Sequence, residues 1–217
     1  MNNKLSTNSF VLIIASLIFG CRGPVKEADK NKAATSALSL HAGDERYMAI
    51  DTKESTVTWQ GSSLAGVNPH KGYVYLSKGE LMIENGQLKG GTAEVNMNTI
   101  EDEAHRSNNN LIKHLKDPDF FDVKQFPFST IAITKVASTN TEDKQITGNL
   151  TIKNITHPVT FPAKVEVKNG LVKANGKLTI DRTLWDIRYR SGKFYGHLAN
   201  GAISDSIAFD IKIIAKK

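Results

Sequence analysis

Residues 157–181 read HPVTFPAKVEVKNGLVKANGKLTID and decide the fold that we expect for this chain. Two runs of alternating apolar and polar residues flank Asn169-Gly170, which is the strongest short-range signal for a β-hairpin. A two-residue turn sets Lys168 opposite Leu171. Counting outward predicts the inward-facing pairs Val167–Val172, Val165–Ala174, Ala163–Gly176 and Phe161–Leu178. Pro162 cannot donate a ladder hydrogen bond, so the last pair is the least constrained.

The inward face of this hairpin narrows to Ala163 and Gly176 at its middle. If residues 154–157 form the loop before the hairpin, Gly148 lies beside Ala163 on the preceding strand. Such a band of minimal side chains, with larger residues on both sides of it, predicts an elongated apolar void inside a closed sheet. The alternative is that bulky residues from the opposite wall fill this space, as in a packed sandwich.

Most of the chain from Tyr47 onward alternates apolar and polar residues with a period of two, which is typical of half-buried strands. Short turn signals separate most of these runs, so the strands are expected to pair antiparallel in a barrel or a sandwich. We predict eight strands, at residues 56–61, 72–84, 88–98, 128–137, 145–153, 158–168, 171–180 and 203–215.

One helical excursion interrupts this pattern between the third and fourth predicted strands. Asn108–Asn110 can open a helix that runs to Lys116, and Pro118 then ends it. The apolar stripe of this helix consists of Leu111, Ile112 and Leu115.

The N-terminal segment has the pattern of a bacterial lipoprotein leader. Lys4 precedes an apolar run at residues 10–19, and Gly20 comes directly before Cys21, the single cysteine. The run is too short to cross a bilayer, which takes about 20 residues, and suits a secretory signal. We expect a lipoprotein signal peptide at residues 1–20, a diacylated Cys21 that attaches the chain to a membrane, a flexible tether at 21–46 and a folded domain at 47–217. The alternative is an ordinary secretory signal with an incidental cysteine.

Composition and motifs argue against several functional classes. The net charge of +6 is scattered along the chain, whereas nucleic-acid binding usually needs a clustered basic face, so we expect no nucleic acid partner. The six histidines show no metal-ligand spacing, and residues 117–122 lack the glycine and the terminal glutamate of a calcium loop. No nucleophile motif or phosphate-binding glycine loop occurs. We therefore expect no catalytic residues, no metal and no cofactor.

Aromatic and basic side chains near the predicted void have two readings each. Trp59 and Trp185 either line a lipid tunnel or belong to an ordinary core. His114 either hydrogen-bonds a ligand head group or sits at a helix C-terminus near the negative end of the dipole. Three arginines either meet a polar head or are solvated: Arg182, Arg188 and Arg190.

Several motifs follow one another in a fixed order along residues 47–217. They are Tyr47-x-x-Ile-Asp51, Val57-x-Trp59, His70-x-Gly72, Gly79-Glu-Leu81, Asn110-Leu-Ile-Lys-His-Leu-Lys116, Asp119-Phe-Phe-Asp-Val123, Gly148-Asn-Leu-Thr-Ile-Lys-Asn-Ile-Thr156, Asp181-Arg182 and Ile203-x-Asp205. The ensemble resembles the YceI-like, lipocalin-like family of polyisoprenoid-binding proteins. The resemblance implies an all-β, eight-stranded antiparallel barrel whose lumen holds a long amphiphile. It also implies a periplasmic or secreted protein without established enzymatic activity.

We therefore expect a lipoprotein of the bacterial cell envelope, periplasmic or in the outer membrane. It would carry or store an isoprenoid quinone, a polyisoprenoid or a fatty-acid-like lipid. The alternative is a non-enzymatic, envelope-tethered interaction module that binds a protein or a glycan. The oligomeric state is left open, a homodimer included. The predicted ligand-lining residues are Trp59, Leu115, Phe121, Leu150, Phe161, Ala163, Gly176, Leu178, Trp185 and Phe209.

Overall fold

The computed structural model describes residues 45–64, 66, 69–104, 109–140, 142–195 and 201–217. The predicted signal peptide, Cys21 and all but the last two residues of the predicted tether lie outside these ranges. The first strand begins at Glu45, slightly ahead of the expected domain boundary at Tyr47.

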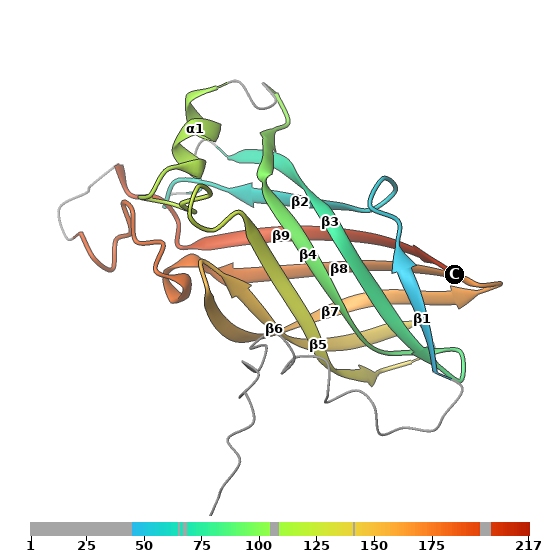
Figure 1. Cartoon of the computed structure of the whole chain (residues 1–217). Coiled ribbons are helices and arrows are strands. Elements are labelled where there is room, and N and C mark those ends of the chain that lie inside the picture. The colour runs from blue at the N-terminus through green and yellow to red at the C-terminus, as the bar shows by residue number, and fades with distance from the viewer. Residues whose placement is uncertain (1–44, 65, 67–68, 105–108, 141, 196–200) are drawn as a thin grey trace, which may run out of the picture. The chain divides into compact units, whose positions relative to one another are not determined.

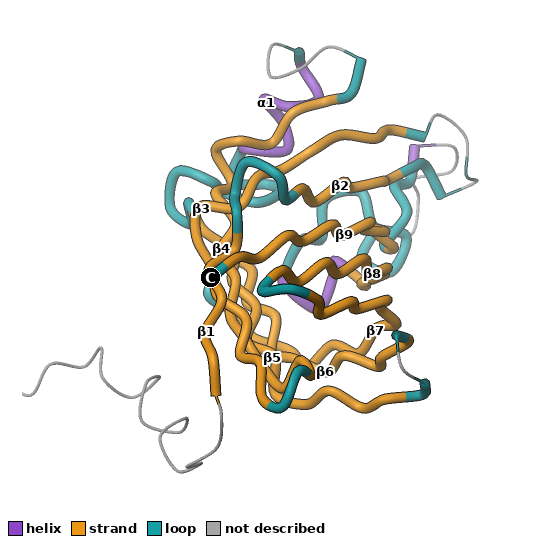
Figure 2. Tube along the Cα trace, turned by 90° about the vertical axis from the view of Figure 1, so that its right-hand side faces the viewer, coloured by secondary structure: helices purple, strands orange, loops and turns teal. Residues whose placement is uncertain are grey.

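The fold is a closed antiparallel β-barrel with one short α-helix among the described residues, which confirms the predicted lipocalin-like architecture. The sheet order is β1-β3-β2-β9-β8-β7-β6-β5-β4, and additional pairings of β3 with β4 and of β1 with β9 close the barrel. Figure 1 shows the strands from the side, and in Figure 2 they follow one another round a ring. The strands are β1 (Glu45–Ile50), β2 (Thr56–Gly61), β3 (His70–Glu84), β4 (Gln87–Asp102), β5 (Phe128–Ser138), β6 (Asp143–Ile152), β7 (Ile155–Lys168), β8 (Leu171–Asp181) and β9 (Ser206–Lys216).

Strands β1 and β2 share one position in the barrel wall, between β3 and β9. Strand β1 pairs with the end of β3, and β2 pairs with its beginning. The barrel wall therefore has eight strand positions although nine strands are present. The sequence pattern did not predict β1, because this position of the wall is divided into two short strands with a gap between Asp51 and Ser55. At this break the Ser55 hydroxyl donates to the carbonyl of Ile214 at 3.3 Å and accepts from its amide at 3.0 Å. A side chain thus replaces the missing ladder bonds.

The predicted hairpin is confirmed from its turn as far as Ala163, which pairs with Gly176. The predicted register of the preceding hairpin is wrong. Lys153 and Asn154 both have positive φ, 50° and 59°, and form a two-residue turn in place of the expected loop at residues 154–157. Gly148 consequently lies opposite Val159, not beside Ala163.

The helical excursion is α1 (Asn110–Lys116), as predicted between the third and fourth of the expected strands. The side chain of Asn109 caps it by accepting a hydrogen bond from the amide of Ile112 at 2.7 Å. Ile112 and Leu115 are buried, so the predicted apolar stripe packs α1 onto one end of the barrel.

The two ends of the barrel differ. At the closed end, two-residue turns at Asn85-Gly86 and Asn169-Gly170 join neighbouring strands, and the buried side chains of Ile83, Val172 and Ala215 fill the interior. At the other end, called the mouth, longer connections span residues 62–69, 103–127 and 182–205. They include α1 and the 3₁₀ helix η1 (Arg182–Trp185), and in Figure 1 they gather on the left.

Gly72 is required where β3 passes under the ring of Trp59. A Cβ at Gly72 would lie 1.9 Å from the Glu101 carbonyl oxygen and 2.6 Å from the Trp59 ring. We expect Gly72→Ala to lower the free energy of unfolding by about 3 kcal/mol, because the backbone of β4 would have to shift.

Urea denaturation of Gly72→Ala beside Gly61→Ala checks this expectation. A Cβ at Gly61 meets nothing within 4 Å, so this control should change stability by less than about 0.5 kcal/mol. Equal unfolding midpoints for the two variants would contradict the close packing of Trp59 on Gly72.

Candidate functional site

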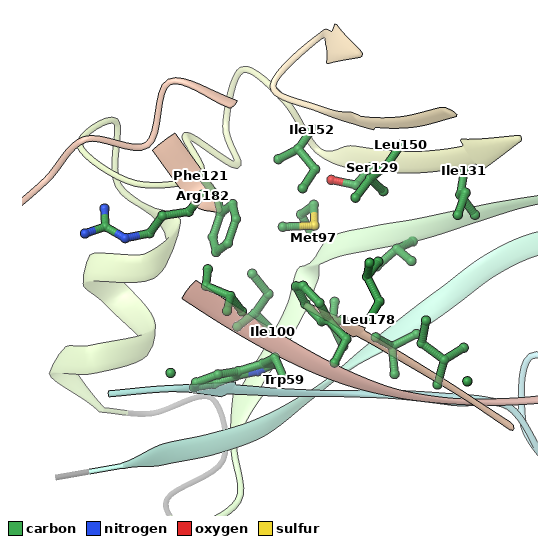
Figure 3. Close-up of a pocket in the computed structure, with 18 of the residues that line it drawn as sticks. Trp59, Met97, Ile100, Phe121, Ser129, Ile131, Leu150, Ile152, Leu178 and Arg182 are labelled. Carbon is green, nitrogen blue, oxygen red and sulfur yellow. The ribbon is translucent and has the colours of Figure 1, made fainter. Parts of the chain in front are cut away.

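The interior of the barrel contains an apolar cavity of about 470 Å³. In Figure 3, side chains from strands on different sides of the wall point toward one space, among them Trp59, Met97, Ile131, Leu150 and Leu178. Small-molecule sites usually measure about 300–1,000 Å³, so the cavity is large enough for a ligand. It extends to the mouth, where the exposed residues His70 and Arg190 belong to its lining.

Inward-facing side chains remain partly exposed because the space that they face is empty. Leu150, Phe209 and Ile211 point inward by strand alternation yet are only half-buried. Next to them on β9, Ile207 and Ile213 are buried. In a packed sandwich all of these positions would be covered, so the structure favours the hollow barrel over the packed alternative.

The structure brings the predicted lining residues together, with one exception. Trp185 lies outside the cavity: its ring packs on His157 with centroids 5.2 Å apart, and its Nε1 donates to the Leu150 carbonyl at 3.2 Å. These two contacts hold η1 against the barrel wall. Trp185 lies on this 3₁₀ helix and not on a strand, so strand alternation does not set the direction of its ring. The predicted residues in the cavity wall are Trp59, Leu115, Phe121, Leu150, Phe161, Ala163, Gly176, Leu178 and Phe209.

The predicted band of small residues across three strands does not exist. The β6–β7 register places Lys144 opposite Ala163, and a Cβ on Gly176 would already lie 3.0 Å from the Phe161 ring. The void therefore comes from the circumference of the barrel rather than from a row of small side chains.

Two buried ring nitrogens in the cavity wall have no hydrogen-bond partner among the described residues. They are Nε1 of Trp59 and Nε2 of His114. The His114 ring lies edge-on to Tyr189, with centroids 4.3 Å apart, and is 5.9 Å from Phe120. A buried polar group without a partner is unfavourable, so a bound molecule with a polar group near these nitrogens would relieve this cost.

Arg182 is fully buried and organises the mouth, which matches neither of its predicted roles. It donates to the carbonyls of Ser204 at 3.0 Å, Ile187 at 2.7 Å and Ile203 at 3.2 Å, and it pairs with Asp205 at 3.3 Å. Figure 3 shows its guanidinium directed away from the other lining side chains. Burial lowers the pKa of Arg182, and the negative charges of Asp205 and Asp181 partly offset this effect.

Asp181 fastens the same connection from the end of β8. It accepts hydrogen bonds from the amide and hydroxyl of Thr183 and forms an ion pair with Lys193. Burial alone would raise the pKa of Asp181, but the hydrogen bonds from Lys193 and Thr183 outweigh it and lower the pKa. Arg188, by contrast, is exposed beside Asp186 at 2.7 Å, as expected for a solvated arginine.

Comparisons with known proteins place this barrel in a family. The YceI-like domain model matches residues 48–215, most of the chain. This chain belongs to the YceI-like domain family. Among curated relatives, a UPF0312 protein of Shewanella denitrificans is 30% identical over 120 residues, which cover 52% of this chain and 59% of the relative. A UPF0312 protein of Pseudomonas putida is 43% identical over 105 residues, covering 46% and 50%. The chain thus spans about half the length of these curated relatives.

Two solved structures share the fold of this YceI-like chain. BcnA of Burkholderia cenocepacia gives a TM-score of 0.62 at 18% identity, covering 77% of this chain and 99% of BcnA. A polyisoprenoid binding domain from Saccharophagus degradans, implicated in plant cell wall breakdown, gives 0.57 at 9% identity, covering 78% and 97%.

The YceI-like cavity also includes residues that strand periodicity could not find. Met97 and Ile100 both face inward although they are three residues apart. Between them β4 bulges: Thr99 Oγ1 donates to the Asn96 carbonyl at 2.6 Å and accepts from the Tyr75 amide at 2.9 Å. A stricter reading of alternation on the predicted fourth strand would have found Ile131 and Ile133.

Other kinds of site are not seen within the described ranges. They contain no group of three or more His, Cys, Asp or Glu side chains that could hold a metal ion. None of their helices has the length and apolarity needed to cross a bilayer.

Replacement of Arg182 tests its role at the mouth. We expect Arg182→Met to lower the free energy of unfolding by about 3 kcal/mol or more, because three carbonyls lose their donor and Asp205 keeps only the more distant Lys193, at 3.8 Å, as a counter-ion.

Thermal and urea unfolding of Arg182→Met are compared with Arg188→Met. The Arg188 pair is exposed, so its loss should cost at most about 1 kcal/mol. A stable Arg182→Met protein that has lost a bound ligand would instead show that Arg182 contacts ligand directly.

Proposed function

We propose that this YceI-like barrel binds one long amphiphilic lipid, such as an isoprenoid quinone, a polyisoprenoid or a fatty-acid-like molecule, and carries or stores it. The hydrocarbon tail occupies the cavity and the head lies toward the mouth. The observation that carries this proposal is the apolar cavity of about 470 Å³, with lining residues from all nine strands and an opening at the mouth.

The volume of the cavity suits a long chain. A methylene group takes up about as much space as a water molecule, roughly 30 Å³ in the liquid, so the cavity has room for on the order of fifteen carbons. Each methylene transferred from water contributes about 0.8 kcal/mol, and the sum, on the order of 10 kcal/mol, must exceed the cost of association. Burial of the tail is therefore sufficient as the driving force.

The two ring nitrogens in the wall specify the head group. Trp59 Nε1 can only donate a hydrogen bond, so the lipid should carry an acceptor oxygen, as quinones, phosphates, carboxylates and amides do. His114 Nε2 can donate or accept, depending on the tautomer. The polyisoprenoid binding domain of Saccharophagus degradans, which shares the fold, supports an isoprenoid chain as the tail.

We propose further that Cys21 is acylated and that the protein is a lipoprotein of the bacterial cell envelope. The support is the leader pattern, an apolar run at residues 10–19 followed by Gly20-Cys21. Two acyl chains would hold the protein on a membrane durably, and the barrel would then load and release its lipid next to that membrane.

A larger side chain at Ala174 should expel the lipid. Ala174 lines the cavity, is half-buried and is paired with Val165 and Ile213. We expect Ala174→Phe to reduce co-purifying lipid at least tenfold while the barrel still folds, because the ring takes the volume of the tail. Native mass spectrometry and solvent extraction of the purified protein measure the lipid.

Asn175→Phe is the matched control, because the neighbouring side chain is exposed on the outside of the same strand. It should retain the lipid of the unmodified protein. Undiminished lipid in Ala174→Phe, or the absence of lipid in the unmodified protein even after incubation with ubiquinone, would overturn the proposed function.

Loss of the His114 nitrogen should weaken head-group binding. His114→Phe keeps a ring between Phe120 and Tyr189 but removes Nε2. We expect its affinity for a short-chain ubiquinone to fall about fivefold, because a hydrogen bond contributes about 1 kcal/mol. Titration of delipidated protein gives this value. Lys113→Phe, an exposed neighbour on α1, is the control, and equal affinities would exclude His114 as a head-group contact.

A further inference from the structure

Large apolar side chains that remain exposed gather at the mouth of the barrel. Over the described ranges, one of them, Tyr47, lies on β1 away from the mouth. The others lie on connections at the mouth or at a strand end beside it: Leu64, Phe128, Leu184, Phe194 and Tyr195, with exposed fractions of 45–63%. Single exposed apolar residues are ordinary, but their collection at one end points to an interaction surface.

We call five exposed residues on two connections at the mouth the rim: Leu64, Arg188, Arg190, Phe194 and Tyr195. The rim joins two connections that are distant in sequence. The amide of Leu64 donates to the carbonyl of Ala202 at 2.9 Å, and the Leu64 side chain lies against Gly192, 3.8 Å from the position of a Cβ. The Arg188 guanidinium lies over the Phe194 ring, 4.8 Å from its centroid.

Backbone hydrogen bonds tie part of the rim to a buried residue, and the rim borders the cavity. The amides of Phe194 and Tyr195 both donate to the carbonyl of the buried Ser191 at 3.1 Å. Ser63 and Ile203, which pair with each other beside Leu64, belong to the cavity lining, as does Arg190. A lipid that enters the cavity therefore passes next to the exposed apolar side chains of the rim.

We propose that the rim docks on the surface of an anionic phospholipid bilayer, so that the mouth faces the membrane from which lipid enters. This inference rests on the proposed function. Exposure of a lipid tail to water costs on the order of 0.8 kcal/mol of free energy for each methylene. Docking would let the tail pass from the bilayer into the cavity without this exposure. Leu64, Phe194 and Tyr195 reach the apolar boundary of the bilayer, while the arginines stay among the head groups.

The charges of the rim fit an anionic lipid surface. Residues 182–205 contain four Arg and Lys residues: Arg182 is buried, Arg188 and Lys193 form ion pairs with Asp186 and Asp181, and Arg190 is exposed. Arg190 has no ion-pair partner in the described part of the chain, and its guanidinium lies 5.9 Å from the Tyr189 ring centroid. Basic residues near a negatively charged membrane surface contribute about 1 kcal/mol each. Aromatic and basic side chains together are typical of interfacial contacts.

Site-specific labelling tests which end of the barrel touches the membrane. In the full chain with Cys21→Ser, a single new cysteine at Tyr195→Cys or at Tyr47→Cys carries an NBD fluorophore. Both tyrosines are exposed, 50% and 43%, but they lie at different ends of the barrel. With vesicles of phosphatidylcholine and phosphatidylglycerol, we expect blue-shifted, at least twofold brighter emission from position 195, and no change from position 47.

The patch itself is tested by Leu64→Ser combined with Phe194→Ser in the Tyr195→Cys protein. These substitutions should abolish the response at position 195, and vesicles of phosphatidylcholine alone or high salt should weaken it. No response at position 195, an equal response at both positions, or a response that survives the double substitution would overturn the docking proposal.

Lipid extraction from the same samples separates this proposal from the proposed function. Lipid-loaded protein whose position 195 does not respond would refute docking alone. Protein that never contains lipid, whatever the response of its labels, would refute the proposed function, and with it the inference that docking serves lipid entry.

Discussion

A closed ring of paired strands with eight positions sets the circumference of the barrel, and the cavity depends on it. The ring closes where β3 meets β4, and it continues past the gap between β1 and β2 because the Ser55 hydroxyl bonds both the amide and the carbonyl of Ile214. A sheet closed by eight strands leaves an interior that side chains can just fill or that can hold one small ligand. In this chain the closed end is filled and the middle is not.

Order at the mouth has a different origin, because only isolated bridges pair the connections there and several carbonyls bond to side chains instead. Arg182 supplies donors to three of those carbonyls from a buried position, and Asp181 ties the beginning of the same connection to Thr183 and Lys193. The charged side chain of Arg182 thus donates hydrogen bonds to carbonyls in the connections, as the amides of neighbouring strands do in the wall. This arrangement keeps the entrance open without filling it, since the guanidinium points away from the cavity.

The sequence predicted the strands and the helix well, because period-two alternation, Asn169-Gly170 and the capping Asn109 act locally. It failed where side chains replace or reshape backbone pairing. The turn at Lys153-Asn154 contains no glycine and was not recognised in the sequence. The expected register of β6 with β7 was therefore wrong. The bulge near Thr99 interrupts the alternation of β4, so Met97 and Ile100 were not predicted in the cavity lining. Trp185 was predicted there but lies on the 3₁₀ helix, outside the cavity. The unpartnered nitrogens of Trp59 and His114 depend on which distant groups fail to reach them, and no local pattern records that.

The direction in which β1 runs has a consequence for the proposed attachment of the chain at its N-terminus. Glu45 pairs with Glu84 beside the tight turns, so the polypeptide enters the wall at the sealed base, and β1 and β2 then lead toward the opening. Fifteen residues of β3 span about 50 Å at roughly 3.3 Å per residue. If the chain is attached through its N-terminus, as proposed above, about one strand length therefore separates the place where the chain enters the wall from the opening that lipid enters.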